Sequence, residues 1–185
     1  MLKLLIIIPA YNEASNIERV VDNLIENYSQ YDYVIVNDGS SDDTRKICAN
    51  RKYNFLDLPI NVGLAGAIRA GIRYANYHGY DYAVQIDGDG QHEPKYIKDM
   101  LEKMETAQAD IVIGSRFKEE KKPNSMRMLG SRIISGAIKL TTGGKKIEDV
   151  TSGMRLFNKR MIKNFGYNMH YSPEPDTIAY LLNCG

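Results

Sequence analysis

The stretch LLIIIPAYNE, residues 4–13, determines how the first half of the chain is expected to fold. The run from Leu2 to Ile8 is apolar and rich in isoleucine, with Lys3 as its one polar residue, and Pro9 ends it. An apolar run without alternation is typical of a parallel strand that is buried on both faces. The polar residues that follow would therefore lie at the carboxyl end of a central strand.

Strands and helices are expected to alternate beyond this stretch. Apolar residues recur at helical spacing from Ile17 to Tyr28, from Leu64 to Ala75 and from Ile97 to Met104. Short apolar segments between and after these helices predict further strands at Tyr33–Val36, Phe55–Leu58, Tyr82–Ile86, Ile111–Ile113 and Met154–Phe157. This alternation predicts an α/β fold with a mostly parallel sheet and helices on both faces.

Two local signals predict where helices begin. Ser40 or Ser41 can cap a helix that has Asp42 and Asp43 in its first turn. Pro94 suits the first position of the helix that follows it.

Composition limits the class of protein. The chain has 185 residues, of which 43% are hydrophobic and 25% charged, and its net charge is +1. This balance is typical of a globular domain and gives no support to binding of nucleic acid through bulk charge. The two cysteines, Cys48 and Cys184, form no disulfide framework, which fits a reducing compartment.

Targeting signals are not recognised in the sequence. The longest apolar run is far shorter than the roughly 18 residues that a membrane-spanning helix needs, and no cleavage site follows it. We therefore expect a cytoplasmic protein that can still touch the inner face of the plasma membrane. The chain ends directly after the apolar stretch Ile178 to Leu182, so we expect the native protein to continue beyond Gly185.

Polar residues follow four of the predicted strands. A single segment of this kind is ordinary turn chemistry. Because ligands of open α/β sheets bind outside the carboxyl ends of the strands, four such segments at one edge predict a ligand site. The segments are PAYNE at 9–13, NDGS at 37–40, DGDGQH at 87–92 and GSRF at 114–117.

The segment that begins at Asp87 carries the clearest chemistry. Asp87 and Asp89 stand two residues apart in a glycine-rich turn, and Gln91 adds a neutral oxygen at the same period. Mg²⁺ and Mn²⁺ prefer such oxygen ligands and leave positions open for substrate phosphates. His92 could join an Mn²⁺ ion, but its position better suits the entry to a helix.

Other phosphate and metal motifs are excluded. An EF-hand would need a glutamate where Lys98 stands, counting from Asp87. A dinucleotide-binding turn would need G-x-G-x-x-G after the first strand, where the chain has PAYNE, and the chain contains no P-loop.

Six motifs in order resemble the inverting family 2 glycosyltransferases. They are IIPAYNE, VNDGSSDDT, NVGLAGAIRAG, DGDGQH, GSRF and DVTSGMRLF, which together span about Leu4 to Phe157. The greatest similarity is to the dolichol-phosphate mannosyltransferase branch, which includes bacterial polyprenyl-phosphate sugar transferases. The resemblance implies a GT-A fold, with residues 1–117 as a nucleotide-sugar-binding half and residues 118–185 as the acceptor side of the same domain.

The resemblance also implies roles for individual residues. Asp38 would read the base, and the base and ribose would be held by Pro9, Ala10, Tyr11 and Glu13. The metal and diphosphate would be bound by Asp87, Gly88, Asp89 and Gln91. The acceptor phosphate would be faced by Arg116, Arg127 and Ser131, and the junction of sugar and acceptor would be lined by Asp149, Ser152 and Gly153. Asp149, Asp89 and Arg116 are thus the predicted catalytic residues.

Two positions depart from the family pattern. Asn37-Asp38 stands where the family often has two aspartates, and the segment YSPEPDT at 171–177 is not the usual text of the mannosyl branch. A phosphate acceptor is already an anion, whereas a sugar hydroxyl needs a carboxylate to take its proton. Asp149 is the first candidate for that base, followed by Glu174 and Asp176.

The predicted function is metal-dependent transfer of a sugar, with UDP as the favoured carrier, to a polyprenyl phosphate. Transfer to a hydroxyl of a cell-surface glycan, or binding of a nucleotide sugar without transfer, are the alternatives. A sugar-nucleotide pyrophosphorylase is disfavoured because PAYNE is no glycine- and lysine-rich loop. The predicted helix Met126–Leu140 combines an apolar side with Arg127, Arg132 and Lys139, which suits a membrane surface or a small membrane partner subunit.

Overall fold

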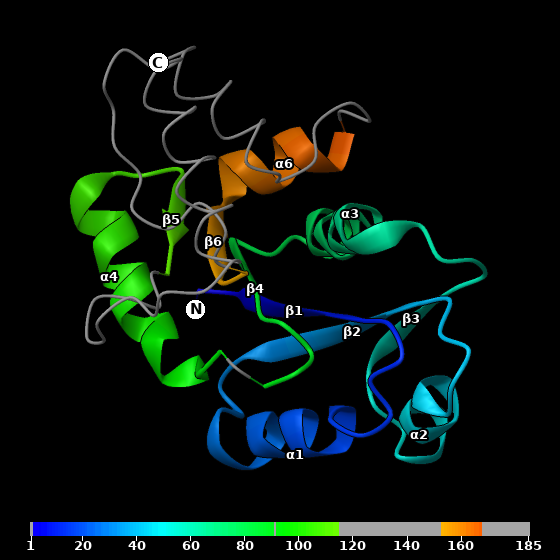
Figure 1. Cartoon of the computed structure of the whole chain (residues 1–185). Helices are drawn as coiled ribbons and strands as arrows, with labels where there is room; N and C mark the ends of the chain where they lie inside the picture. Colours follow the sequence, from blue (N-terminus) through cyan, green and yellow to red (C-terminus); the bar gives the residue numbers. More distant parts are fainter. Residues whose placement is uncertain (1, 91, 115–152, 168–185) are drawn as a thin grey trace, which may run out of the picture.

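The computed structural model describes residues 2–90, 92–114 and 153–167. Within these ranges one sheet of six strands forms, in the order β3-β2-β1-β4-β6-β5 (Figure 1). The strands are β1 (Leu4–Ala10), β2 (Asp32–Asp38), β3 (Phe55–Leu58), β4 (Tyr82–Gln85), β5 (Ile111–Ile113) and β6 (Arg155–Asn158). Strands β1 to β4 pair in parallel, and β6 runs antiparallel to both β4 and β5.

Helices cover both faces of this sheet, as the alternation predicted (Figure 1). Three of them pack on one face: α1 (Ile17–Asn27), α2 (Thr44–Asn50) and α4 (Ile97–Ala107), the last entered through a 3₁₀ turn at Pro94–Tyr96. The other face is covered by α3 (Gly63–Tyr77) and α6 (Lys159–Tyr167). The predicted mostly parallel α/β sheet is thus confirmed.

The core divides at β1, in which every residue is buried. Leu4, Ile6 and Ile8 point to the layer of α1, α2 and α4, whereas Leu5 and Ile7 point to the layer of α3 and α6. This division follows from the period of two along a strand. It explains why the sequence of β1 is apolar throughout instead of alternating.

The direction of β6 matters for the site. The segment Met154–Phe157 was expected as a strand, and it is found as β6, paired with β4 through Gln85 and Arg155. Because β6 is antiparallel, its amino end lies at the same edge of the sheet as the carboxyl ends of β1, β2 and β4. Gly153, two residues before the start of β6, is therefore brought to the edge where the polar segments gather.

The start of α2 differs from the expected cap. Neither Ser40 nor Ser41 caps this helix, whose N-cap position is held by Asp43 without a side-chain hydrogen bond. Asp42 instead accepts a hydrogen bond from the N–H of Thr44 at 2.9 Å. Pro94 does stand first in its element, but that element is the 3₁₀ turn that precedes α4.

Several predicted positions lie outside the described residues. They are Gln91, Arg116, Arg127, Ser131, Asp149 and Ser152, the helix predicted at 126–140, the segment with Glu174 and Asp176, and the expected division after residue 117. Among the helices that the structure does describe, none has the length and apolar character needed to cross a bilayer.

Gly71 is expected to be essential for the packing of α3 on β1. A Cβ at Gly71 would lie 2.3 Å from Cγ2 of Ile7, in the buried layer between helix and sheet. Gly71→Ala should therefore lower the free energy of unfolding by about 1–3 kcal/mol, because overpacking outweighs the gain in helix propensity. Chemical denaturation monitored by circular dichroism measures this change.

Gly66→Ala is the matched control in the same helix. Its Cβ would lie 2.6 Å from Cγ2 of Val62, a side chain that is half exposed, whereas Ile7 is fully buried. We expect a much smaller change at Gly66, and equal losses at the two positions would contradict the packing argument.

Candidate functional site

A pocket of about 270 Å³ opens between the carboxyl ends of β1 and β2 and the start of α3. It is lined by Pro9, Ala10, Tyr11, Asp38, Asn61, Gly63, Leu64 and Ala67. The first four are residues that the sequence assigned to a nucleotide site. The other four come from the NVGLAGAIRAG motif, which supported the family resemblance but received no role. The sequence could have predicted a binding role for this motif, because a helix that starts at the ligand edge of a sheet brings its first turn close to the ligand.

Asp38 is one of the residues that line this pocket, and it is 3% exposed. Its Oδ1 accepts a hydrogen bond from the N–H of Val62 at 2.8 Å. Gly39 has φ of +62°, and a Cβ there would lie 2.5 Å from the backbone of Ile60 and Asn61. The turn after β2 is therefore packed directly on the loop that leads into α3. Asp38 thus fixes the start of that helix, and it also lines the pocket.

Asn12 joins the loop after β1 to the loop after β2. Its backbone is left-handed, with φ of 58°, a conformation that asparagine tolerates better than most residues. Its N–H donates to Oγ of Ser40 at 3.0 Å, and its Oδ1 accepts from the N–H of Ser41 at 2.9 Å. The expected cap residues of α2 are therefore used to hold the PAYNE segment in place.

A second set of hydrogen bonds continues this connection. The N–H of Glu13 donates to Oγ1 of Thr44 at 2.9 Å, and the N–H of Ala14 donates to Oδ2 of Asp42 at 3.0 Å. Partial burial acts to raise the pKa of Asp42. Hydrogen bonds from the hydroxyl and N–H of Thr44 and from the N–H of Ala14 outweigh it, so the pKa lies below its usual range. The ionised carboxylate of Asp42 thus stabilises the contact between the two loops.

The Asp87-Gly88-Asp89 turn packs against the PAYNE segment. A Cβ at Gly88 would lie 3.0 Å from the carbonyl oxygen of Pro9 and 3.4 Å from Cγ of Glu13. Glu13 is therefore placed beside the turn, and it is not among the residues that line the pocket. Its Oε2 accepts a hydrogen bond from Nδ2 of Asn16 at 2.9 Å. The predicted nucleotide residues and the predicted metal residues are thus neighbours at one edge of the sheet.

Three neighbours surround the carboxylate of Asp87. Nδ1 of His92 lies 3.3 Å from Oδ2, and Nε2 of Gln85 lies 3.5 Å from Oδ1. The backbone at Gly153 is so close that a Cβ there would lie 2.3 Å from Oδ2. His92 was expected as an entry residue of the next helix, whereas its imidazole is buried against Asp87. The side chain of Asp87 keeps about a third of its surface exposed.

Arg19 contacts the same turn from α1 and was missed by the sequence analysis. Its Nη2 donates to the backbone carbonyl of Asp89 at 2.9 Å. Gly90 has φ of +80°, and a Cβ there would lie 2.8 Å from the guanidinium of Arg19. No sequence signal marks Arg19, because its partner is a backbone atom 70 residues away.

The turn fits a hard divalent cation with few protein ligands. No group of three or more metal-binding side chains is assembled among residues 2–90, 92–114 and 153–167. Mg²⁺ is commonly bound through one or two carboxylates, with the remaining positions left to water and substrate phosphates. Asp87 and Asp89 supply two such carboxylates on a turn whose side chains are partly exposed. The donor set is therefore of the kind that Mg²⁺ or Mn²⁺ accepts.

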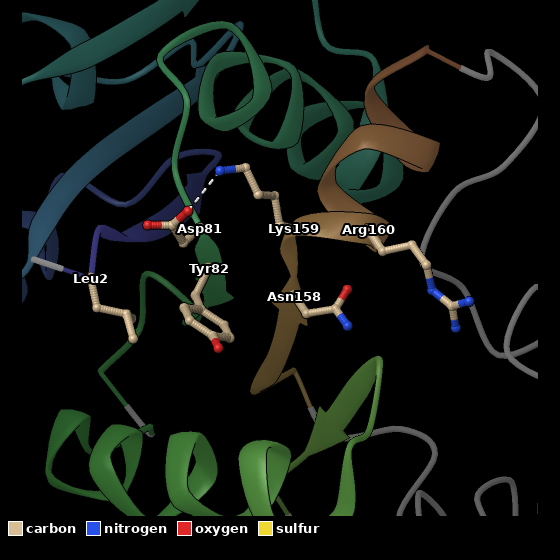
Figure 2. A pocket seen from close by; sticks show the side chains of 6 residues that line it. All are labelled: Leu2, Asp81, Tyr82, Asn158, Lys159 and Arg160. Carbon is tan, nitrogen blue, oxygen red and sulfur yellow. Dashed lines mark hydrogen bonds and ion pairs between the residues drawn. The ribbon is translucent and has the colours of Figure 1, made fainter.

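A larger hollow, of about 530 Å³, lies at the opposite edge of the sheet (Figure 2). Figure 2 shows the side chain of Lys159 reaching toward Asp81. These two residues form an ion pair at 2.8 Å, and Arg160 forms an ion pair with Asp110. Each cation that lines this hollow is thus already paired with a carboxylate. We assign this hollow a structural role at the junction of β4, β6 and α6.

Comparison with known proteins decides the family. Residues 5–166 match the family described as Glycosyl transferase family 2. The chain belongs to this family. The resemblance seen in the sequence motifs is thereby confirmed, and the order of strands and helices is that of a GT-A fold.

Two curated relatives of this family 2 chain carry informative names. One is a UDP-N-acetylglucosamine–dolichyl-phosphate N-acetylglucosaminyltransferase from Methanococcus voltae, 33% identical over 85% of this chain and 70% of the relative. The other is an undecaprenyl-phosphate mannosyltransferase from Micrococcus luteus, 31% identical over 84% of this chain and 66% of the relative. The chain thus spans about two thirds of the length of these relatives.

A solved structure with the same fold is a mannosyltransferase from Pyrobaculum calidifontis in complex with GDP-Man and Mn²⁺. It is 17% identical to this chain, with a TM-score of 0.61 over 89% of this chain and 46% of that chain. At this identity the similarity supports the fold alone.

The contact between the two loops should depend on pH through Asp42. Because the pKa of Asp42 is lowered on folding, its contribution is present above the unfolded value of about 3.9 and is lost as the pH falls through the folded value. Asp42→Asn should lower the melting temperature above about pH 5, and the difference from the parent should shrink toward about pH 3. Melting curves recorded across this range test the prediction.

Asp43→Asn serves as the control, because the side chain of Asp43 makes no capping hydrogen bond. A difference between parent and Asp42→Asn that stays constant with pH would show that ionisation of Asp42 does not stabilise the loops.

Proposed function

We propose that this protein transfers a sugar, with inversion, from a nucleotide-diphosphate sugar to a polyprenyl phosphate. The observation that carries the proposal is the position of the 270 Å³ pocket directly beside the Asp87-Gly88-Asp89 turn, in a chain of glycosyl transferase family 2. A nucleoside in the pocket would place its diphosphate next to the carboxylates of the turn.

The pocket supports binding of the nucleoside. Pro9, Ala10 and Tyr11 form one wall, and Leu64 and Ala67 of α3 form the other. These walls offer apolar surface to a base and ribose, and the carboxylate of Asp38 offers an acceptor. Since Oδ1 of Asp38 already binds Val62, the second oxygen would accept a hydrogen bond from the base. A uracil N3–H is a suitable donor, and we favour UDP as the carrier, as in the name of the Methanococcus voltae relative.

The turn supports binding of the diphosphate through a divalent cation. Asp87 and Asp89, with Gln91, would hold Mg²⁺ or Mn²⁺. The bound cation would supply positive charge that stabilises the diphosphate as it leaves. Arg19 holds the backbone of the turn that carries these two carboxylates.

The acceptor side rests on the family resemblance and on the relatives. Both relatives are named for transfer to a polyprenyl or dolichyl phosphate. Arg116, Arg127 and Ser131 would bind such a phosphate, because the guanidinium fork matches its oxygens. A phosphate acceptor needs no base to remove a proton. Asp149 would then line the junction of sugar and acceptor, close to Gly153 in the sequence. A lipid acceptor would bring the protein to a membrane surface, directly or through a membrane partner subunit.

Transfer to a glycan hydroxyl is the second candidate function, since YSPEPDT departs from the mannosyl pattern. A hydroxyl acceptor would require Asp149, Glu174 or Asp176 as base. Binding of a nucleotide sugar without transfer would need neither acceptor nor base.

Metal-assisted donor binding is the first test. Mg²⁺ or Mn²⁺ should strengthen binding of UDP, and Asp89→Asn should remove most of that gain, because it deletes one anionic ligand while keeping the shape of the side chain. Isothermal titration with UDP and with GDP, with and without Mn²⁺, measures the effect, and we expect a loss of roughly tenfold or more in the presence of metal.

Asp99→Asn, an exposed position on α4, is the control for the change in charge. Equal affinity of the parent for UDP with and without metal would exclude the metal step. A preference for GDP would overturn the assignment of the base.

Transfer to lipid is the second test. With a labelled donor, the protein should transfer sugar to undecaprenyl phosphate and not to soluble oligosaccharides. Arg127→Ala should raise the concentration of lipid acceptor needed for half-maximal rate and leave donor binding unchanged. Arg45→Ala, which removes an exposed arginine of α2 that pairs with Asp57 of β3, is the control. Transfer to the oligosaccharide alone would overturn the lipid hypothesis and favour a carboxylate base.

A further inference from the structure

We propose that His92, Gln85 and Gly153 are positioning residues that hold the carboxylate of Asp87 in one orientation for a divalent cation. The inference rests on the metal step of the proposed function. It adds three residues, from three separate segments, that act through Asp87 and are not themselves expected to bind the cation.

His92 fixes one side of the carboxylate. The residue is 6% exposed, and its Nδ1 lies 3.3 Å from Oδ2 of Asp87 and 3.4 Å from the N–H of the same residue. This nitrogen is within reach of both groups: it donates to Oδ2 when it carries a hydrogen, and accepts from the N–H of Asp87 when it does not. The local chain explains how it arrives there: Gly90 turns with φ of +80°, and Pro94 starts the next element. The chain thereby returns the ring of His92 to Asp87.

Gln85 contacts the other oxygen of the Asp87 carboxylate, Oδ1. It is 2% exposed, at the end of β4, between Ile7 of β1 and Arg155 of β6. Its Nε2 faces Oδ1 of Asp87 at 3.5 Å, while its Oε1 is buried and has no hydrogen-bond partner within residues 2–90, 92–114 and 153–167. Leaving a buried amide oxygen unsatisfied costs about 1–3 kcal/mol. An apolar residue at this position would avoid that cost, so we infer that the amide is present for the sake of its contact with Asp87.

The backbone of Gly153 packs against the carboxylate of Asp87. A Cβ there would lie 2.3 Å from Oδ2, 2.5 Å from Oδ1 and 2.6 Å from Cγ of Asp87. These distances leave no room for any side chain while the carboxylate keeps its position. A glycine is therefore required at position 153, because any side chain there would displace the carboxylate of Asp87. Gly153 precedes β6, so the antiparallel direction of that strand is what brings it to Asp87.

The three contacts together restrict the rotation of the Asp87 side chain. A ligand that is already oriented loses less conformational freedom when a cation binds. Removal of groups that orient a metal ligand commonly weakens metal binding by about 10-fold to 100-fold. The expected consequence is a weaker affinity for the cation, with nucleotide affinity in the absence of metal left unchanged.

Binding of Mn²⁺ in the presence of UDP tests the proposal directly, with the unbound Mn²⁺ measured by electron paramagnetic resonance. His92→Leu and Gly153→Ala should each raise the Mn²⁺ concentration for half-saturation by roughly tenfold or more. His92→Asn, which can replace the Nδ1 contact, should recover part of the loss. Gln85→Met, which keeps the length of the side chain without the amide, should also weaken binding. Melting curves show whether each variant is folded.

Gly114→Ala is the matched control for Gly153→Ala. The N–H of Gly114 donates to the carbonyl oxygen of Met154 on the neighbouring strand, and a Cβ at Gly114 would have the Met154 side chain as its nearest neighbour, at 3.3 Å. Folded variants that bind Mn²⁺ as tightly as the parent would overturn the positioning role, as would equal losses for Gly153→Ala and Gly114→Ala. A parent that binds no Mn²⁺ with UDP would overturn the metal step of the proposed function as well, which distinguishes the two failures.

Discussion

The burial of β1 on both faces is the constraint on which the rest of the structure depends. Because all seven of its residues are covered, no polar side chain can lie along the strand without a partner. Polar groups are therefore confined to its carboxyl end, where Tyr11, Asn12 and Glu13 follow. The parallel neighbours β2 and β4 end at the same edge, and their loops hold Asp38 and Asp87. The candidate site is thus a direct consequence of how the middle of the sheet is filled.

Contacts between loops then turn this edge into a site of defined shape. Asn12 and Thr44 connect the loops after β1 and β2, while Asp38 connects the loop after β2 to the start of α3. Gly88 lies so close to Pro9 that the Asp87-Gly88-Asp89 turn borders the wall of the pocket. Most of these bonds join a side chain to a backbone N–H. They hold the backbone of each loop in place and leave the pocket walls to side chains of Tyr11, Leu64 and their neighbours.

The features that depend on local sequence pattern could be predicted from the sequence. The apolar run of β1, the helical spacing of α1, α3 and α4 and the Asp87-Gly88-Asp89 turn were all recognised, and four predicted nucleotide residues line one pocket. The features that were missed depend on contacts between distant segments. The direction of β6 cannot be read from its composition, and without it Gly153 has no reason to be near Asp87. Arg19 likewise has no local signal, because its partner is a backbone atom brought near by the packing of α1. His92 was recognised as part of the DGDGQH segment, but its contact with Asp87 was not.

The double use of Asp38 has a consequence for how substrate preference could change during evolution. One oxygen of its carboxylate accepts a hydrogen bond from Val62 at the start of α3, so a substitution at this position would disturb the helix as well as the pocket. A lineage that changes the ligand of this pocket would find fewer obstacles in the pocket walls. Leu64 is more than half exposed and Tyr11 is half exposed, so neither carries much of the core. Divergence of specificity in this fold is therefore expected to be concentrated at the walls of the pocket, while Asp38 stays constant.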